Sequence, residues 1–274
     1  MNNIFINKGH QQQYENNGFV IIEKAKSLDI DYILDFYSNL PRVDDNGFYA
    51  SLYSKNPKYK LDIHNFLADI YQEIINTIFY DYKVLTANFV TKTVGDNSIM
   101  PPHQDWSFVD ENKYASFNIW IPLCDVTPKN GCLYLLKSCQ KLPFTIRGTG
   151  VRIDFHEIRS LNFENMKSIP IKSGEIVIYD HRTIHASPPN NSNKKRIAIA
   201  SAIVPKKAQT IHYYYNEKYN KLEKYKVDSK FFQEYTFGDS ELPKSVEIID
   251  YLKNYSNPTY SENSLKSFYS KNNY

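Results

Sequence analysis

Two histidines and an aspartate in this chain have the types and the spacing of a metal-ligand set. His103 and Asp105 are separated by one residue, and His185 follows 82 residues after the first histidine. Residues i and i+2 of an extended segment point to the same side, so His103 and Asp105 can bind one ion. Two histidines and one carboxylate form the facial triad of non-haem Fe(II) enzymes, which leaves coordination positions open. The sequence therefore predicts a metal site whose third ligand comes from a neighbouring strand.

His181 is the alternative to His185 as the distal ligand, because the segment His181-Arg182-Thr183-Ile184-His185 contains both. We prefer His185, since it directly precedes Ala-Ser-Pro-Pro-Asn and lies 11 residues before Arg196. His181 is then expected to be a polar residue at the end of a strand.

The elements that must position these residues change in type along the chain. Residues 18–22 read as a short strand, and apolar positions three and four apart predict helices over 28–40 and 61–79. Short β-branched or alternating segments follow, and these predict strands at 84–94, 116–123, 132–136, 175–179, 196–204 and 210–215. This order predicts a mainly β fold with N-terminal helices, an antiparallel sandwich or small barrel.

We expect one domain over residues 1–274, in which a helical support of about 1–82 buttresses a β core of about 83–215. Residues 140–170 form a long connection with few strand signals, and such loops are often lids. The polar and aromatic segment of about 216–274 is predicted to cover the surface, with a helix around 244–253.

Composition excludes several classes of protein. The 274 residues carry 33 Lys and Arg against 30 Asp and Glu, a balance too weak to indicate nucleic acid as a partner. The three cysteines form no CxxC pair, so a disulfide framework or a thiolate zinc site is not expected. The sequence has no apolar run of membrane-spanning length and begins without a secretion signal. We therefore expect a cytoplasmic protein with no membrane partner.

Four segments together resemble the phytanoyl-CoA dioxygenase-like family of Fe(II)/2-oxoglutarate oxygenases. They are PPHQDW (101–106), SFNIWIPLCDVTPKNGCLYLL (116–136), SGEIVIYDHRTIHASPPN (173–190) and Arg196 before its strand. The resemblance implies a double-stranded β-helix (jelly-roll, cupin-like) core, with His103, Asp105 and His185 as the iron ligands. It also implies that Arg196 holds the distal carboxylate of 2-oxoglutarate, for which a planar guanidinium is well suited. Ser187 matches a position that assists this carboxylate, and Asn88 is a further candidate contact.

The resemblance implies the reaction as well. Fe(II), 2-oxoglutarate and O₂ would oxidise a C–H bond of a small molecule, with release of succinate and CO₂. Halogenases of this kind lack the carboxylate ligand, so the presence of Asp105 favours hydroxylation, although desaturation or ring formation could use the same triad. Two alternatives stay open, a non-catalytic protein that binds a small molecule and a cupin-type metal hydrolase or isomerase.

The substrate is the least determined part of the hypothesis. Trp106, Asn118 and Trp120 are candidates to line its pocket, because Asn118 and Trp120 alternate with the apolar Phe117 and Ile119 on one strand. Arg147, or Arg152 beside it, could meet a carboxylate or phosphate of the substrate. An amphipathic or anionic small molecule, free or tethered to a carrier, is expected.

Overall fold

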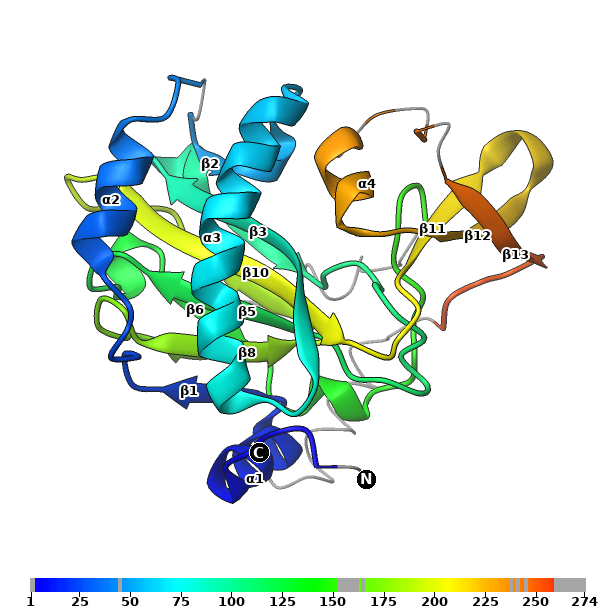
Figure 1. Cartoon of the computed structure of the whole chain (residues 1–274), viewed down its shortest axis with the longest axis horizontal. Helices are drawn as coiled ribbons and strands as arrows, with labels where there is room; N and C mark the ends of the chain where they lie inside the picture. The colour runs from blue at the N-terminus through cyan, green and yellow to red at the C-terminus, as the bar shows by residue number, and fades with distance from the viewer. Residues whose placement is uncertain are drawn as a thin grey trace.

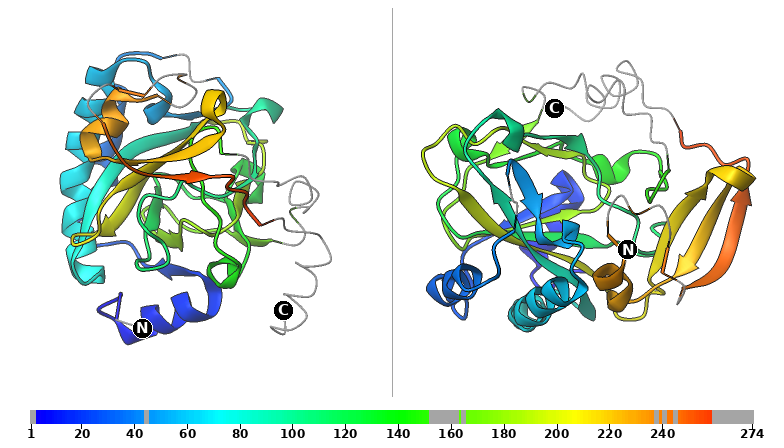
Figure 2. Two further views of the ribbon diagram at one scale, coloured as in Figure 1. Left: turned by 90° about the vertical axis from the view of Figure 1, so that its right-hand side faces the viewer. Right: turned by 90° about the horizontal axis from the view of Figure 1, so that it is seen from above.

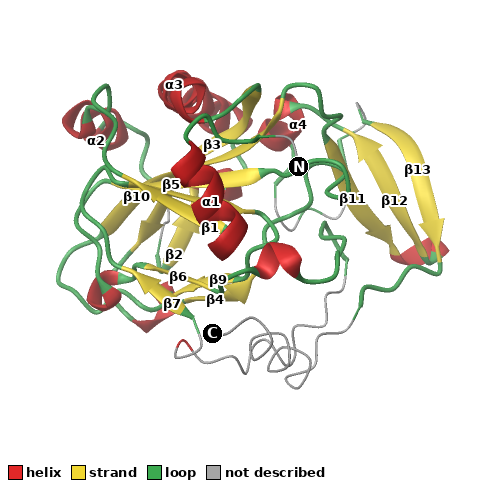
Figure 3. Cartoon of the chain, turned by 90° about the horizontal axis from the view of Figure 1, so that it is seen from below, coloured by secondary structure: helices red, strands yellow, loops and turns green. Residues whose placement is uncertain are grey.

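The computed structural model describes residues 3–43, 46–151, 163, 166–236, 239, 242–243 and 246–258. In this part of the chain, helices cover one face of a large sheet, and a smaller sheet lies against its other face (Figure 1, Figure 3). A third sheet stands to one side of these layers and is formed by the C-terminal part of the chain.

The large sheet has six antiparallel strands in the order β1-β8-β5-β10-β3-β2. These are β1 (Phe19–Ile22), β8 (Ile176–Asp180), β5 (Phe117–Pro122), β10 (Arg196–Pro205), β3 (Tyr82–Lys92) and β2 (Phe48–Ala50). The smaller sheet has the order β4-β9-β6-β7, with β4 (Met100–His103), β9 (His185–Ser187), β6 (Leu133–Leu135) and β7 (Lys167–Ile169). The two sheets form the jelly-roll core, which confirms the predicted fold class.

The helical layer comprises α1 (Lys8–Asn17), α2 (Ile30–Ser38) and α3 (Pro57–Ile78). α3 begins at Asn56, whose side chain accepts a hydrogen bond from the Tyr59 amide, and Pro57 occupies its first turn. Its apolar face packs on the large sheet, chiefly on β3, and Ile63, Leu67 and Ile74 share one buried cluster with Phe117, Ile119 and Ile121 of β5. The opposite face of β5 is thereby left for the interior between the two sheets.

The C-terminal segment differs from its prediction. The predicted helix around 244–253 is wrong, because Glu247–Lys253 form strand β13. This strand pairs with β12 (Lys221–Lys226), which in turn pairs with β11 (Ile211–Asn216). The helix of this segment is α4 (Ser229–Glu234), and its Phe231 and Phe232 are buried against the β core. The segment therefore completes the core as well as covering the surface (Figure 2).

Two further predicted segments contain strands of the two sheets. The N-terminal support contributes strands β1 and β2 to the large sheet, so it is not purely helical. The predicted lid of 140–170 ends in a strand of the smaller sheet, β7, while residues 152–162 and 164–165 lie outside the described part of the chain. Among the described residues, no helix combines the length and the apolar character needed to cross a membrane.

Candidate metal centre

The smaller sheet brings the two predicted histidine ligands together. His103 ends β4, His185 begins β9, and the two residues pair directly across these antiparallel strands. Their ring centroids are 4.1 Å apart. Asp105 follows two residues after His103, with its Oδ1 3.8 Å from Nε2 of His185. The candidate ligand atoms of all three residues lie within 4.8 Å of one another, a separation that a single ion can bridge.

Each of the three side chains is oriented by a second contact. Nδ1 of His103 lies 2.8 Å from the Pro101 carbonyl oxygen, and Nδ1 of His185 lies 3.0 Å from that of Thr183. A carbonyl can only accept, so Nδ1 carries the proton in both rings and the lone pair of Nε2 is free for a metal. Asn118 donates to Oδ2 of Asp105 at 3.1 Å, which leaves Oδ1 directed to the same point.

The electrostatics of the site favour the protonation states that metal binding needs. Burial, and then the neighbouring His185, lower the pKa of His103 to about 4. Burial alone would raise the pKa of Asp105, but the surrounding histidines and the Asn118 hydrogen bond lower it overall. Near neutral pH the site therefore presents a neutral His103 and an ionised carboxylate, as a divalent cation requires.

Arg196 is a buried cation whose guanidinium has an open hydrogen-bonding position. It is 2% exposed, stands over the Trp120 ring at 5.3 Å, and its Nε has no hydrogen-bond partner among the described residues. Burial lowers the pKa of Arg196 to about 10, so the group stays charged at neutral pH. A buried guanidinium whose Nε lacks a hydrogen-bond partner among the described residues, beside a candidate metal site, suits a ligand that carries a carboxylate. The residues present thus fit both iron and 2-oxoglutarate.

Ser187 and Asn88, the other two predicted cosubstrate contacts, line the same cavity, and each already donates one hydrogen bond to a backbone carbonyl oxygen. The Ser187 hydroxyl donates to the Gly131 carbonyl oxygen at 2.9 Å, and Asn88 Nδ2 donates to that of Phe89 at 3.2 Å. Lys92, which the sequence did not single out, lies buried nearby. Its ammonium donates to the carbonyl oxygens of Ser98, Ser187 and Pro188 and so ties β3 to the end of β9.

A cavity of about 520 Å³ extends from the three candidate ligands. Trp106, Asn118 and Trp120 line it. Its aromatic lining residues are Phe48, Tyr53, Trp106, Phe108, Trp120, Tyr179, Phe232 and Tyr235. Two of these, Phe232 and Tyr235, belong to the C-terminal segment, where no periodic pattern in the sequence could have identified them.

His181 also lines this cavity but is not in the candidate ligand set. It is fully buried, and its Nδ1 lies 2.8 Å from the Ser116 hydroxyl oxygen. The geometry therefore groups His185, and not His181, with His103 and Asp105.

Arg147 does not line the cavity, contrary to the expectation from the sequence. It is 1% exposed, and its guanidinium makes two hydrogen bonds to the Glu111 carboxylate at 2.8 and 2.5 Å. Glu111 thus balances the charge of Arg147, so this guanidinium is not available to bind an anionic substrate. The alternative candidate, Arg152, lies outside the described residues.

Comparison with known proteins agrees with this geometry. The sequence profile of the phytanoyl-CoA dioxygenase family matches residues 46–198. A phytanoyl-CoA dioxygenase of Arabidopsis thaliana is 31% identical over 125 residues, which are 44% of each chain. A phytanoyl-CoA dioxygenase domain-containing protein 1 homolog of Dictyostelium discoideum is 28% identical over 163 residues, 54% of this chain and 55% of that protein. The chain thus spans about half the length of the curated relatives that it matches.

Solved structures share the fold at low sequence identity. HygX from Streptomyces hygroscopicus, crystallised with nickel and 2-oxoglutarate bound, is 13% identical over 73% of this chain and 87% of its own, with a TM-score of 0.55. The epimerase SnoN, in complex with Fe3+, alpha ketoglutarate and nogalamycin RO, is 16% identical over 74% and 85%, with a TM-score of 0.51.

Proposed function

Because the chain belongs to the phytanoyl-CoA dioxygenase family, we propose that it is an Fe(II)- and 2-oxoglutarate-dependent oxygenase that hydroxylates a C–H bond of a small molecule. The observation that carries the proposal is the His103, Asp105 and His185 cluster at one end of a cavity that also contains the orphaned Arg196. A metal hydrolase needs the cluster of candidate ligands but does not need a buried arginine such as Arg196 in the same cavity.

The chain's own residues would act by holding and orienting. Nε2 of each ligand histidine and Oδ1 of Asp105 would hold the iron, which would keep coordination positions for 2-oxoglutarate. Arg196 would hold the distal carboxylate of 2-oxoglutarate. When bound, iron and 2-oxoglutarate supply the oxidising chemistry, in which O₂ converts the oxo acid to succinate and CO₂ and gives one oxygen atom to the substrate. The two sheets and the aromatic walls exclude water from this reaction.

The cavity supports an uncharged substrate. Of the described residues that line it, Arg196 is the sole lysine or arginine, and the cosubstrate would occupy it. Since Arg147 is already paired with Glu111, the anionic substrate expected from the sequence has no partner among these residues. Aromatic side chains dominate the remaining walls, so we propose a free, neutral molecule with an apolar ring or chain as the substrate.

An anaerobic titration tests the proposed function. Fe(II) is added to the apo-protein, 2-oxoglutarate follows, and the visible charge-transfer band of the complex is recorded. We expect a saturable band in the wild type and none in His103→Ala. His64→Ala, a change of a half-buried histidine on α3, serves as the matched control and should keep the band.

The outcomes separate the candidate functions. Succinate formation that rises in the presence of neutral aromatic compounds would support the oxygenase and its substrate class. Zinc binding with no affinity for 2-oxoglutarate would refute the oxygenase in favour of a cupin-type hydrolase. Absence of any metal binding by the folded wild type would point to a non-catalytic binding protein.

A further inference from the structure

The segment that carries Asp105 has no regular secondary structure, yet a metal ligand must be held in place. Residues 104–116 join β4 to β5 and contain no helix or strand. We propose that the buried ion pair of Arg147 and Glu111 positions Asp105 and thereby sets the metal affinity of the site. This inference rests on the assignment of Asp105 as a ligand in the proposed function.

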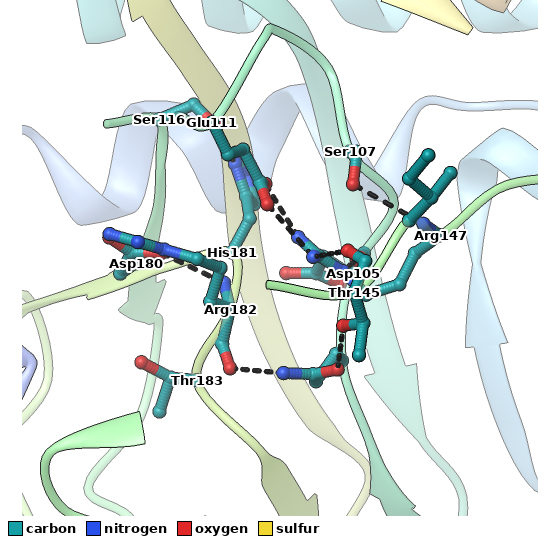
Figure 4. Close-up of polar contacts among 12 residues, drawn as sticks. Asp105, Ser107, Glu111, Ser116, Thr145, Arg147, Asp180, His181, Arg182 and Thr183 are labelled. Carbon is teal, nitrogen blue, oxygen red and sulfur yellow. Dashed lines mark hydrogen bonds and ion pairs between the residues drawn. The ribbon is translucent and has the colours of Figure 1, made fainter. Parts of the chain in front are cut away.

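Each of the three guanidinium nitrogens of Arg147 donates a hydrogen bond to this segment. Its Nε donates to the backbone carbonyl oxygen of Asp105 at 2.6 Å. Its two terminal nitrogens donate to the two carboxylate oxygens of Glu111 at 2.8 and 2.5 Å, and one of them also donates to the Thr145 carbonyl oxygen at 2.7 Å. One rigid guanidinium thus fixes the segment at two points six residues apart (Figure 4).

The backbone around Arg147 adds two contacts to the same segment. The Ser107 amide donates to the Arg147 carbonyl oxygen at 3.1 Å, and the Arg147 amide donates to the Ser107 hydroxyl at 3.3 Å. Since Ser107 lies two residues after Asp105, these bonds hold the chain directly beyond the ligand. The two peptide units that follow the Asp105 side chain are therefore tied to Arg147.

Gln104 connects this arrangement to the residues that directly precede the other candidate ligand, His185. Gln104 donates through its side chain to the Arg182 carbonyl oxygen and accepts from the Thr145 hydroxyl at 3.3 Å. Arg182 is itself fixed by an ion pair with Asp180 at 2.7 Å, and the next residue is Thr183, whose carbonyl orients His185. The segment that carries Asp105 and the turn that carries His185 are thus joined by hydrogen bonds (Figure 4).

Stability alone is a weak reason for such an ion pair. Both side chains are 1% exposed, so the attraction between the charges must offset a large loss of hydration. Well-packed apolar residues in place of a buried ion pair are often equally stable. The bond from Arg147 to the Asp105 carbonyl is a feature that apolar residues cannot reproduce, and it acts at the ligand itself.

The experiment compares metal affinity with folding stability in matched variants. Co(II) binding is titrated spectroscopically, and thermal unfolding is recorded for the apo-protein. The variants are Arg147→Met, Arg147→Lys and the double variant Arg147→Met/Glu111→Leu. Glu223→Gln is the control, because Glu223 of β12, in the C-terminal sheet, is a buried carboxylate that accepts hydrogen bonds from Asn216 and Tyr225 and pairs with Lys221.

We expect Co(II) affinity to fall about 10- to 100-fold in every Arg147 variant, as is typical when the support of a metal ligand is removed. The double variant should recover thermal stability relative to Arg147→Met, because no buried charge is left unpaired, while its Co(II) affinity stays low. Glu223→Gln should bind Co(II) like the wild type even where its unfolding temperature falls.

Two results would overturn the inference. If Co(II) affinity returns together with stability in the double variant, the ion pair acts only in folding. If Arg147→Met does not fold, the double variant and Arg147→Lys still decide the question, and wild-type affinity in both would refute the positioning role. Failure of the wild type to bind Co(II) would instead refute the assignment of the ligands.

Discussion

Replacing Arg196 by methionine should affect the protein in two opposite ways. The charge is buried, and its Nε has no partner among the described residues. Burial lowers the pKa of Arg196 from 12.5 to about 10, which corresponds to about 3 kcal/mol against the charged form in the folded chain. Loss of the contact with the Trp120 ring would cost about 1 kcal/mol. Arg196→Met should therefore raise the apo-protein's free energy of unfolding by about 2 kcal/mol.

The same substitution should weaken 2-oxoglutarate binding. A buried bidentate pair between guanidinium and carboxylate contributes about 3 kcal/mol, so we expect the dissociation constant to rise about 100-fold. The charge-transfer titration measures this constant, and urea unfolding of the apo-protein measures the stability. Arg196→Lys keeps the positive charge but lacks the planar guanidinium that can make two parallel hydrogen bonds. It should therefore bind 2-oxoglutarate with intermediate affinity.

Lys92→Met is the matched control for these measurements. Lys92 is a second buried basic side chain close to Arg196, and burial lowers its pKa to about 6, but its Nζ donates to three carbonyl oxygens. Its removal should lower stability, because those carbonyls lose their donor. An unchanged affinity of Arg196→Met for 2-oxoglutarate would refute the assignment of Arg196, and a loss of apo stability would refute the claim that its charge is unmatched.

Three further predictions concern other parts of the site. Asn118→Leu removes the donor to Asp105 Oδ2, and Co(II) titration should show about 10-fold weaker binding, whereas equal affinity would contradict the orienting role. Burial lowers the pKa of His212 to about 3, so the unfolded chain binds a proton that the folded chain does not as pH falls below about 6.5. Between pH 6.5 and 4.5, the free energy of unfolding should therefore fall by about 2 kcal/mol less in His212→Phe than in the wild type. Urea unfolding at both pH values measures this difference, and equal losses in the two proteins would contradict the prediction. Phe232→Ala should cost about 3 kcal/mol in the same assay with no change in 2-oxoglutarate affinity, and a changed affinity would show that the aromatic wall reaches the cosubstrate.

The sequence predicted the core of the fold because its signals there are local. Alternation over residues 116–123 separates Phe117 and Ile119 from Asn118 and Trp120, and the structure places these pairs on opposite faces of β5. The predicted strands 84–94, 175–179 and 196–204 correspond to β3, β8 and β10. The single-residue separation of His103 and Asp105 predicted that both side chains reach one point, and their candidate ligand atoms do lie within 4.8 Å of each other, although Asp105 is on an irregular segment.

The parts that were not predicted depend on distant partners. Ile249 and Leu252 have a spacing of three that suits a helix, but pairing with β12 makes this segment a strand. Arg147 is a cation in an irregular segment, and its partner Glu111 lies 36 residues away, so no periodicity connects them. α4 has only six residues, too few to show a helical period, although its Phe232 lines the cavity.

Part of the aromatic wall comes from a different stretch of the chain than the candidate metal site, and this has a consequence for evolution. The ligands and Arg196 all lie within residues 46–198, the stretch that matches the family, whereas Phe232 and Tyr235 lie beyond it. Lys60 of α3 anchors this later stretch by donating to the Tyr235 carbonyl oxygen at 2.9 Å. Substitutions around α4 can therefore remodel the shape of the cavity without changing the candidate ligands or Arg196. Under the proposed function, new substrates can be acquired by diversifying a module that Lys60, the hydrogen bonds of Thr149 and an apolar seam join to the β core.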